Sequence, residues 1–160
     1  GLKRDLLEGG HRVPFIASWP EGGVSGGRQI EALISLADLF ATIAGVVGAP
    51  LEEGVAEDSL DILPALRAGE SVRNELVYHA ANGTLGLRQE NWAYLRPGGI
   101  TKAPEWYKKL WQGNSLDAGA LLFDLSGDLG ERINVLDQYP ERARQMETRL
   151  AEIQKEKSTR

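Results

Sequence analysis

The 160-residue sequence predicts an α/β fold in its first half and an α+β arrangement in its C-terminal half. Three observations support this class. A nearly continuous apolar run at 13–19 is typical of a strand buried on both faces. Apolar residues at helical spacing follow over 36–47. The second half then contains four short strand-like runs and a long amphipathic stretch at its end.

Composition and charge exclude several classes of protein. The chain has 18 Lys and Arg against 23 Asp and Glu, a net charge of -5, which opposes binding to nucleic acid. The sequence has no apolar stretch long enough to cross a bilayer and no signal-peptide pattern, so we expect no membrane partner. The absence of cysteine excludes disulfides, thiolate metal sites and a cysteine nucleophile.

In the first half, residues 1–70, turn and capping signals mark the elements. Gly9-Gly10 precedes the predicted strand at 13–19, and the strand is followed by proline and a glycine-rich stretch. Ser35 begins the pattern S-L-A-D, similar to a capping box, before the helix at 36–47. A short helical or turn segment follows, and we expect Pro64 to interrupt it.

The second half, residues 71–160, predicts a small antiparallel sheet. Asn82-Gly83 is a strong hairpin signal between its first two strands. The four predicted strands are Glu75 to Ala81, Thr84 to Gln89, Trp92 to Arg96 and Leu121 to Leu125. A short helix is predicted between the last two strands, at 104–111.

The last predicted element is a helix at 139–156. Its apolar positions recur at steps of three and four residues, which gives one apolar stripe. A coiled-coil seam is the alternative, but it needs more heptads than this segment holds. We therefore expect the helix to pack on the four-stranded sheet.

The N-terminal segment carries a spaced motif. Lys3 of Gly1-Leu2-Lys3 is followed by Glu8-Gly9-Gly10, by Arg12 and Pro14, and by Trp19-Pro20. This spacing resembles the G-x-K-x4-E-G-G-x-R-x-P-x4-W-P block of arylsulfatase-type sulfatases, a branch of the alkaline phosphatase superfamily. Further blocks similar to the family occur in the family's order at 38–45, 57–59, 87–92, 121–131 and 134–136.

The resemblance implies that the chain is the C-terminal part of a sulfatase. Residues 1–70 would then be the C-terminal portion of the large α/β domain, and 71–160 the small C-terminal subdomain. In such enzymes a formylglycine, made from Cys or Ser in C/S-x-P-x-R, attacks sulfur, and Asp residues with Asn or Gln bind calcium. The chain contains neither motif, so we expect it to hold no metal and to be inactive alone.

The resemblance also implies partners and a location. The chain would work with the remainder of the sulfatase domain on a sulfate ester, either an aryl sulfate or a sulfated glycan. A periplasmic or secreted location is typical of the family. Two alternatives stay open: a phosphoester or phosphonate hydrolase of the same superfamily, and a non-catalytic truncated or scaffold module. A C/S-x-P-x-R motif in the parent gene would separate the sulfatase from both.

Lys3 is the candidate catalytic residue, because it matches the family's lysine that contacts the substrate sulfate. An ammonium group has three donors and a full charge for sulfate oxygens that gain negative charge in the reaction. The alternative is an ordinary exposed lysine. We expect Glu8 and Arg12 to be architectural, with Arg12 pairing a carboxylate such as that of Glu8.

His11 and His79 are candidate substrate-binding residues, since imidazole is a common acid or base near neutral pH. For His11 the alternative is packing where the predicted strand begins. For His79 it is a hydrogen bond to a backbone carbonyl in the hairpin. Lys and aromatic residues near 102–111 could form a rim that binds sulfated sugar, or a helix that covers a sheet edge.

Overall fold

The computed structural model describes residues 2–100, 106, 109 and 119–156, and the chain divides into two compact units. One unit, which we call the sheet unit, joins the N-terminal residues up to Val13 with Val77–Lys155. The other, the helical unit, is Pro14–Leu76. The first residues of the chain therefore belong to the same unit as the sheet, although they are far from its strands in sequence.

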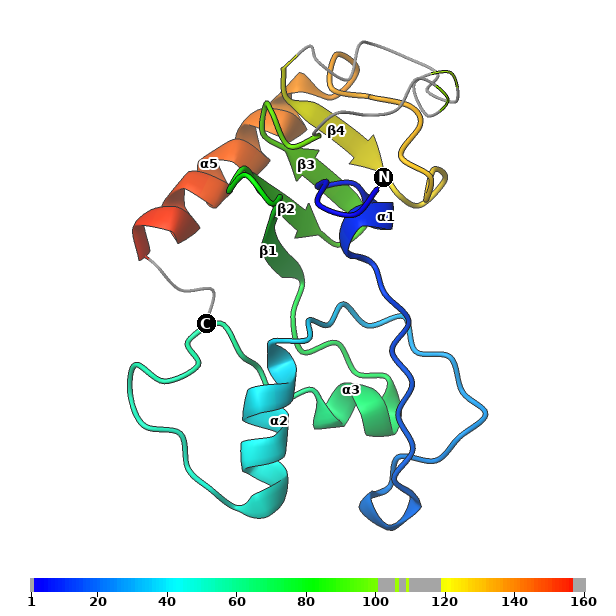
Figure 1. Ribbon diagram of the computed structural model, residues 1–160, viewed down its shortest axis with the longest axis vertical. Coiled ribbons are helices and arrows are strands. Elements are labelled where there is room, and N and C mark those ends of the chain that lie inside the picture. The colour runs from blue at the N-terminus through cyan, green and yellow to red at the C-terminus, as the bar shows by residue number, and fades with distance from the viewer. Residues whose placement is uncertain (1, 101–105, 107–108, 110–118, 157–160) are drawn as a thin grey trace. The chain divides into compact units, whose positions relative to one another are not determined.

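The sheet unit contains the four-stranded antiparallel sheet that the sequence predicts (Figure 1). Neighbouring strands are also consecutive in sequence, so the sheet is a simple meander. At the first turn, the Asn82 side chain accepts a hydrogen bond from the Thr84 N–H at 3.0 Å, and Gly83 has a φ of 84°. The strands are β1 (Glu75–His79), β2 (Leu85–Gln89), β3 (Trp92–Leu95) and β4 (Leu121–Asp124).

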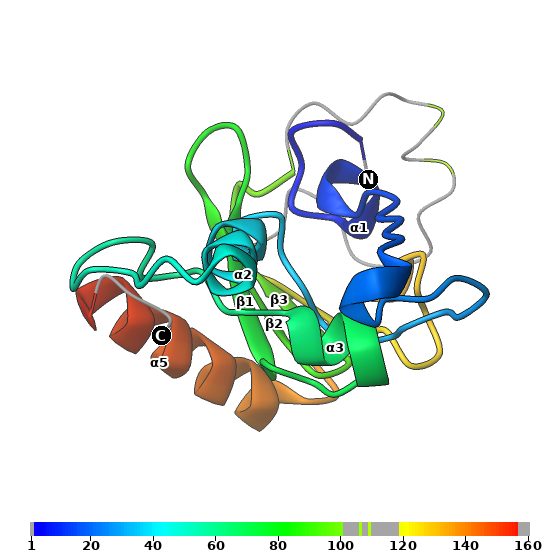
Figure 2. The same cartoon turned by 90° about the horizontal axis from the view of Figure 1, so that it is seen from below.

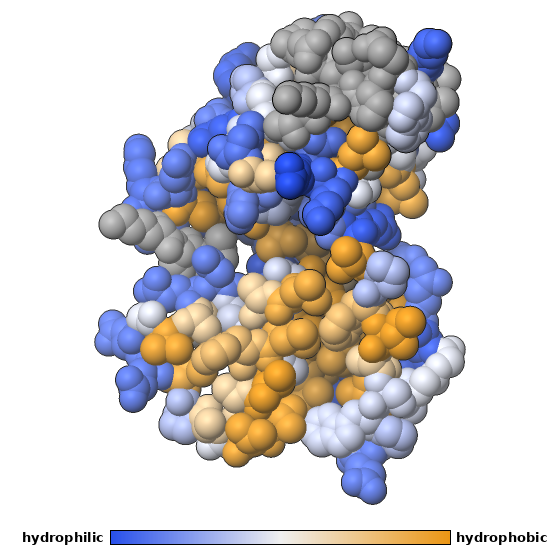
Figure 3. Space-filling view, in the orientation of Figure 1, coloured by the Kyte–Doolittle hydropathy of each residue, from blue (hydrophilic) through white to orange (hydrophobic). Residues whose placement is uncertain are grey.

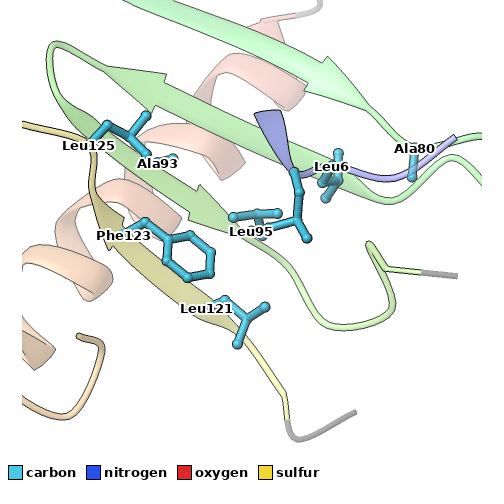
Figure 4. Close-up of a cluster of buried hydrophobic side chains, with 8 residues drawn as sticks. Leu6, Ala80, Ala93, Leu95, Leu121, Phe123 and Leu125 are labelled. Carbon is cyan, nitrogen blue, oxygen red and sulfur yellow. The ribbon is translucent and has the colours of Figure 1, made fainter. Parts of the chain in front are cut away.

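One face of the sheet is covered by the N-terminal segment. Leu6 and Leu7 are fully buried there against alternate residues of β3 and β4, such as Leu95 and Phe123 (Figure 4). Burial of two leucines stabilises this contact by about 3–6 kcal/mol. The cluster consists of Leu6, Leu7, Ala80, Ala93, Leu95, Leu121, Phe123 and Leu125.

The other face of the sheet is covered by α5 (Pro140–Glu156), which lies along it in both ribbon views (Figures 1 and 2). The helix buries Ala143, Met146, Leu150 and Ile153, the stripe that the sequence predicts. The Arg96 guanidinium, just after β3, also binds both carboxylate oxygens of Glu147 at 2.7–3.1 Å. The predicted C-terminal helix is therefore confirmed.

The helical unit contains η1 (Pro20–Gly22), α2 (Asp38–Val47) and α3 (Leu63–Ala68), and Asp38 lies at the centre of its buried polar contacts. The Asp38 carboxylate accepts hydrogen bonds from the Ser35 N–H at 2.7 Å and the Leu60 N–H at 3.0 Å. It also pairs with the buried guanidinium of Arg73. One carboxylate thus begins α2, as the capping-box pattern predicts, and fixes the segment before α3.

The predicted strand at 13–19 is wrong. The structure has only an isolated bridge between Trp19 and Val24, and Ile16 is 93% exposed. A strand is buried on both faces only where neighbouring strands and covering helices exist. The described residues of the helical unit supply no such neighbours for this run.

The structure also divides the chain differently from the expected boundary after residue 70. Residues up to Val13 join the sheet unit because Leu6 and Leu7 are part of its core. Pro64 does not interrupt α3, since it lies in the first turn, where a missing N–H is tolerated. The predicted helix at 104–111 lies largely outside the described residues. No described helix is long and apolar enough to span a membrane.

Candidate functional site

Lys3 lies on a tight turn that we call the Lys3 loop, residues 2–7. The Asp5 N–H donates to the Leu2 carbonyl at 3.0 Å, and the Asp5 carboxylate accepts from the Leu2 N–H at 3.1 Å. Asp5 is only 3% exposed, whereas Lys3 is exposed. None of the described residues pairs with the Lys3 ammonium, which is exposed.

The backbone of the Lys3 loop is fixed to the sheet unit at two points. The Leu6 N–H donates to the Gly99 carbonyl at 2.9 Å, and the Ala81 N–H donates to the Arg4 carbonyl at 3.0 Å. A side chain at Gly99 would have its Cβ 2.2 Å from Leu6 Cδ1, which shows how closely the two segments pack. The backbone of the loop is therefore held at fixed positions, although no described residue pairs with its lysine.

The Glu8-Gly9-Gly10 motif forms the short helix α1 (Glu8–His11), which follows the Lys3 loop directly. A Cβ at Gly10 would lie 2.2 Å from the Asp5 carbonyl oxygen and 2.7 Å from that of Leu2. Only glycine allows this approach, because both obstructing atoms belong to the backbone. The second glycine of the motif thus lets α1 pack against the turn that carries Lys3.

The Glu8 carboxylate lies between two guanidinium groups. Arg12 Nη1 is 2.7 Å from Glu8 Oε2, and Arg88 Nη1 is 3.0 Å from Oε1. The pairing of Arg12 with Glu8 that the sequence predicts is confirmed. Arg88, at the end of β2, links α1 to the sheet, and both members of the Arg88–Glu8 pair are mostly buried.

Glu131 is the most deeply buried charged residue near the Lys3 loop, at 1% exposure. Its Oε2 accepts a short hydrogen bond from the Glu8 N–H, at the start of α1. Its Oε1 has no hydrogen-bond partner among the residues that the structure describes. Burial raises the pKa of the Glu131 carboxyl to about 8, although the hydrogen bond from the Glu8 N–H lowers it; the Glu8 carboxylate acts with burial and Arg88 acts against it.

His11 is in contact with the same group of residues. Its ring stacks on Tyr78 with centroids 4.2 Å apart, and its Nε2 is 3.8 Å from Glu8 Oε1. Burial lowers the pKa of His11, while the Glu8 carboxylate acts in the opposite direction. The stacking agrees with the packing alternative for His11, although His11 lies at the end of α1 and packs on Tyr78 of β1, not at the start of a strand over 13–19.

His79 is exposed at the end of β1, and its Nδ1 lies 3.1 Å from the Ala80 carbonyl oxygen. This is the local contact that the structural alternative for His79 predicts. The structure brings His11 close to the Lys3 loop through α1, but no contact joins His79 to Lys3. A substrate role for either histidine stays a prediction.

The described residues do not fit a metal centre. They contain no group of three or more His, Asp or Glu side chains that could hold an ion. The sequence also lacks the C/S-x-P-x-R motif from which formylglycine could be made. The calcium and formylglycine that the resemblance implies therefore find no site in the described part of this chain.

Sequence reasoning missed the roles of Arg88 and Glu131. Both lie within blocks that resemble the sulfatases, at 87–92 and 121–131, but neither was singled out there. Their partner Glu8 is 80 residues from Arg88 and 123 residues from Glu131. No local signal marked Glu131, because Asp124 and Asp128 in the same block are charged as well.

Comparison with known proteins identifies the family. No protein-family model matches the chain. It is 35% identical over 154 residues, 96% of its length, to an N-acetylgalactosamine-6-O-sulfatase of Bacteroides thetaiotaomicron. It is 33% identical over 149 residues, 87% of its length, to arylsulfatase A of Bos taurus. The chain belongs to the sulfatase family.

A solved sulfatase structure agrees with this assignment. The structure, from work on glycosaminoglycan metabolism in Bacteroides thetaiotaomicron, superposes with a TM-score of 0.78 at 32% identity. The superposition covers 94% of this chain and 31% of the other. The chain spans 29% of the length of each of the two curated sulfatases, and it matches their C-terminal part.

Proposed function

We propose that this chain is the C-terminal part of a sulfate ester hydrolase, in which Lys3 contacts the sulfate group of the substrate. The observation that carries the proposal is the exposed ammonium of Lys3, which pairs with no described residue and stands on a backbone fixed to the sheet unit. The same anchors serve the burial of Leu6 and Leu7, and they also keep the Lys3 backbone in one place.

The chemistry assigned to Lys3 is electrostatic. When a sulfate ester is cleaved, negative charge accumulates on the sulfate oxygens and on the leaving oxygen. A fixed ammonium donor reduces the cost of that charge more in the transition state than in the bound ester, which increases the rate. The nucleophile and the calcium would belong to the remainder of the enzyme, because this chain's described residues supply neither.

A sulfated amino sugar within a glycan is the substrate class that we favour over an aryl sulfate. The similar Bacteroides protein is named as an N-acetylgalactosamine-6-O-sulfatase, and the superposed structure comes from work on glycosaminoglycans. The test is a comparison of two substrates in the full-length enzyme. We expect higher kcat/KM for a 6-sulfated amino sugar than for a nitrophenyl sulfate, and the reverse order would support an aryl substrate.

The remainder of the sulfatase domain is the partner that we propose for α2. Phe40, Ile43 and Val47 follow one stripe of this helix at steps of three and four residues, and they are 56%, 59% and 68% exposed. Apolar residues dominate this part of the surface (Figure 3). A stripe of this kind indicates a surface that another part of the protein covers.

Two variants test that partner. Ile43→Glu would place a charge on the stripe, and Thr148→Glu is a control on the exposed face of α5. We expect Ile43→Glu to lower the thermal midpoint of the full-length enzyme by several degrees and to leave the opening of α2 in the isolated chain nearly unchanged. Equal thermal midpoints of the two variants in the full-length enzyme would count against a covered stripe on α2.

The role of Lys3 is tested by Lys3→Ala in the full-length enzyme. We expect kcat/KM to fall about 100-fold or more, the usual scale for loss of one donor to a transition state. Lys155→Ala, which removes an exposed lysine at the end of α5, is the matched control and should have no effect. A loss below about threefold for Lys3→Ala would exclude this role. The isolated chain should show no sulfatase activity with or without calcium.

A further inference from the structure

The position of the Lys3 ammonium depends on the backbone around it, because no described side chain holds it in place. Two of the contacts that fix this backbone come from Gly99 and Ala81, and they act on the Lys3 loop itself. A third acts at its C-terminal end, where the loop becomes α1. That contact is the hydrogen bond from the Glu8 N–H to the Glu131 carboxyl group.

Stability alone does not explain a glutamate at position 131, because its burial costs free energy. A carboxyl group that is 1% exposed loses its hydration, and the single hydrogen bond at Oε2 leaves Oε1 without a partner. An apolar side chain of similar volume in such a site is often neutral or stabilising. The residue is better explained by the geometry that its hydrogen bond fixes.

The surrounding groups show which geometry this is. The Glu8 side chain is held by Arg12 and Arg88, while the Glu8 backbone N–H is held by Glu131. Glu8 is therefore fixed at both its side chain and its main chain. Since Gly10 packs directly on the Asp5 and Leu2 carbonyls, a shift of α1 would move the turn that carries Lys3.

We propose that Glu131 is a positioning residue for Lys3, which fixes the start of α1 and through it the turn that carries the ammonium. The inference rests on the proposed function of Lys3. A uniformly structural role predicts that loss of Glu131 lowers stability. A positioning role predicts that loss of the acceptor oxygen lowers turnover even where stability is kept, because misplacement of a charged donor by about 1 Å can cost a factor of about 100.

The variants that separate the two roles are Glu131→Met and Glu131→Gln. Methionine has a similar volume without an acceptor oxygen, and glutamine keeps an acceptor for the Glu8 N–H. In the full-length enzyme we expect Glu131→Met to lower kcat about tenfold or more with an unchanged thermal midpoint, and Glu131→Gln to stay within threefold of the parent. Glu141→Ala, at an exposed glutamate of α5, is the control and should change neither value.

A double-mutant cycle tests whether Glu131 acts through Lys3. If it does, Glu131→Met should change the activity of the Lys3→Ala enzyme by less than threefold, because the group that it positions is already absent. If the activity loss of the double variant equalled the product of the two single losses, the two residues would act independently. That result would overturn the inference and leave the role of Lys3 intact. If Lys3→Ala itself left the activity nearly unchanged, the proposed function of Lys3 would be wrong. The two failures are therefore distinguishable.

Hydrogen exchange in the isolated chain provides a readout that needs no activity. Glu131→Met should accelerate exchange of the Glu8 amide at least tenfold relative to the amides of β3, and Glu131→Gln should restore its protection. If Glu131→Met prevents folding, the Glu131→Gln variant still decides the matter. Loss of Glu8 protection or of turnover in a folded Glu131→Gln enzyme would contradict positioning by the acceptor oxygen.

Discussion

Replacing Asp38 by alanine should open the helical unit. Asp38 is fully buried, accepts hydrogen bonds from the Ser35 and Leu60 N–H groups, and pairs with the guanidinium of Arg73, whose side chain is 4% exposed. Removal of one member of a buried ion pair costs about 3–5 kcal/mol, because the other charge is left uncompensated. The two N–H groups that lose their acceptor place the expected cost in the upper part of this range.

A loss of this size is comparable with the whole stability of a unit of about 60 residues, which is roughly 3–9 kcal/mol. The measurement should therefore follow local opening instead of a global transition. We choose hydrogen exchange over α2, residues 38–47, and expect acceleration of about three orders of magnitude, since 1.4 kcal/mol corresponds to a factor of about ten. Glu53→Ala, at an exposed residue, should change the rate less than threefold.

The double variant Asp38→Ala, Arg73→Met separates the ion pair from the hydrogen bonds. It removes the uncompensated guanidinium but still lacks the carboxylate acceptor for the two N–H groups. We expect its exchange to be slower than that of Asp38→Ala and faster than that of the parent. Acceleration below tenfold in Asp38→Ala would refute the view that this carboxylate holds the unit together.

Three further predictions concern the sheet unit. The folded-state pKa of Glu131, about 8, is above its ordinary value of 4.5, so its contribution to stability is present below pH 4.5 and is lost as the pH rises through 8. Above about pH 7.5, where the His11 side chain is neutral in the folded state and in the unfolded state, the free energy of unfolding should therefore fall as the pH rises to 8, and Glu131→Gln should remove this dependence. Gly10→Ala should destabilise the sheet unit by about 1–3 kcal/mol in denaturant unfolding, because its Cβ meets backbone atoms. The Leu6 amide, which is bonded to Gly99, should exchange at least 100-fold more slowly than that of Ile16, and equal rates would contradict the placement of the N-terminal segment.

The elements of the second half could be predicted because their signals are local. Asn82-Gly83 determines a turn within four residues, and the stripe of α5 repeats within each helical turn. The Lys3 motif was also readable, since Lys3 and Glu8-Gly9-Gly10 lie close together in sequence. The residues that fix Glu8 could not be predicted in this way, because they come from the distant positions 88 and 131.

The failure at 13–19 has a different physical cause. An apolar run predicts that its residues are buried, but it does not indicate which segment or chain covers them. Within the described residues Val13 is 56% and Ile16 93% exposed, although the run is among the most apolar of the sequence. The pattern was read correctly as apolar and wrongly as a strand, since strand formation requires a hydrogen-bonding neighbour that the run does not encode.

The same reasoning applies to α2, where polar residues are buried and large apolar residues are exposed, the reverse of the usual distribution in a surface helix. Its buried residues are Asp38, Ala41 and Thr42, two of them polar, while Phe40 and Ile43 are exposed. In a helix whose only neighbours were those of the helical unit, the large apolar side chains would occupy the interior, because burying each would gain about 1.5–3 kcal/mol. The polar side instead binds within the unit by specific hydrogen bonds, such as that from the Ile62 N–H to the Thr42 hydroxyl oxygen, at 3.0 Å. The apolar side is thus left for a second surface, which is the arrangement expected of a helix between two layers of a larger sulfatase domain.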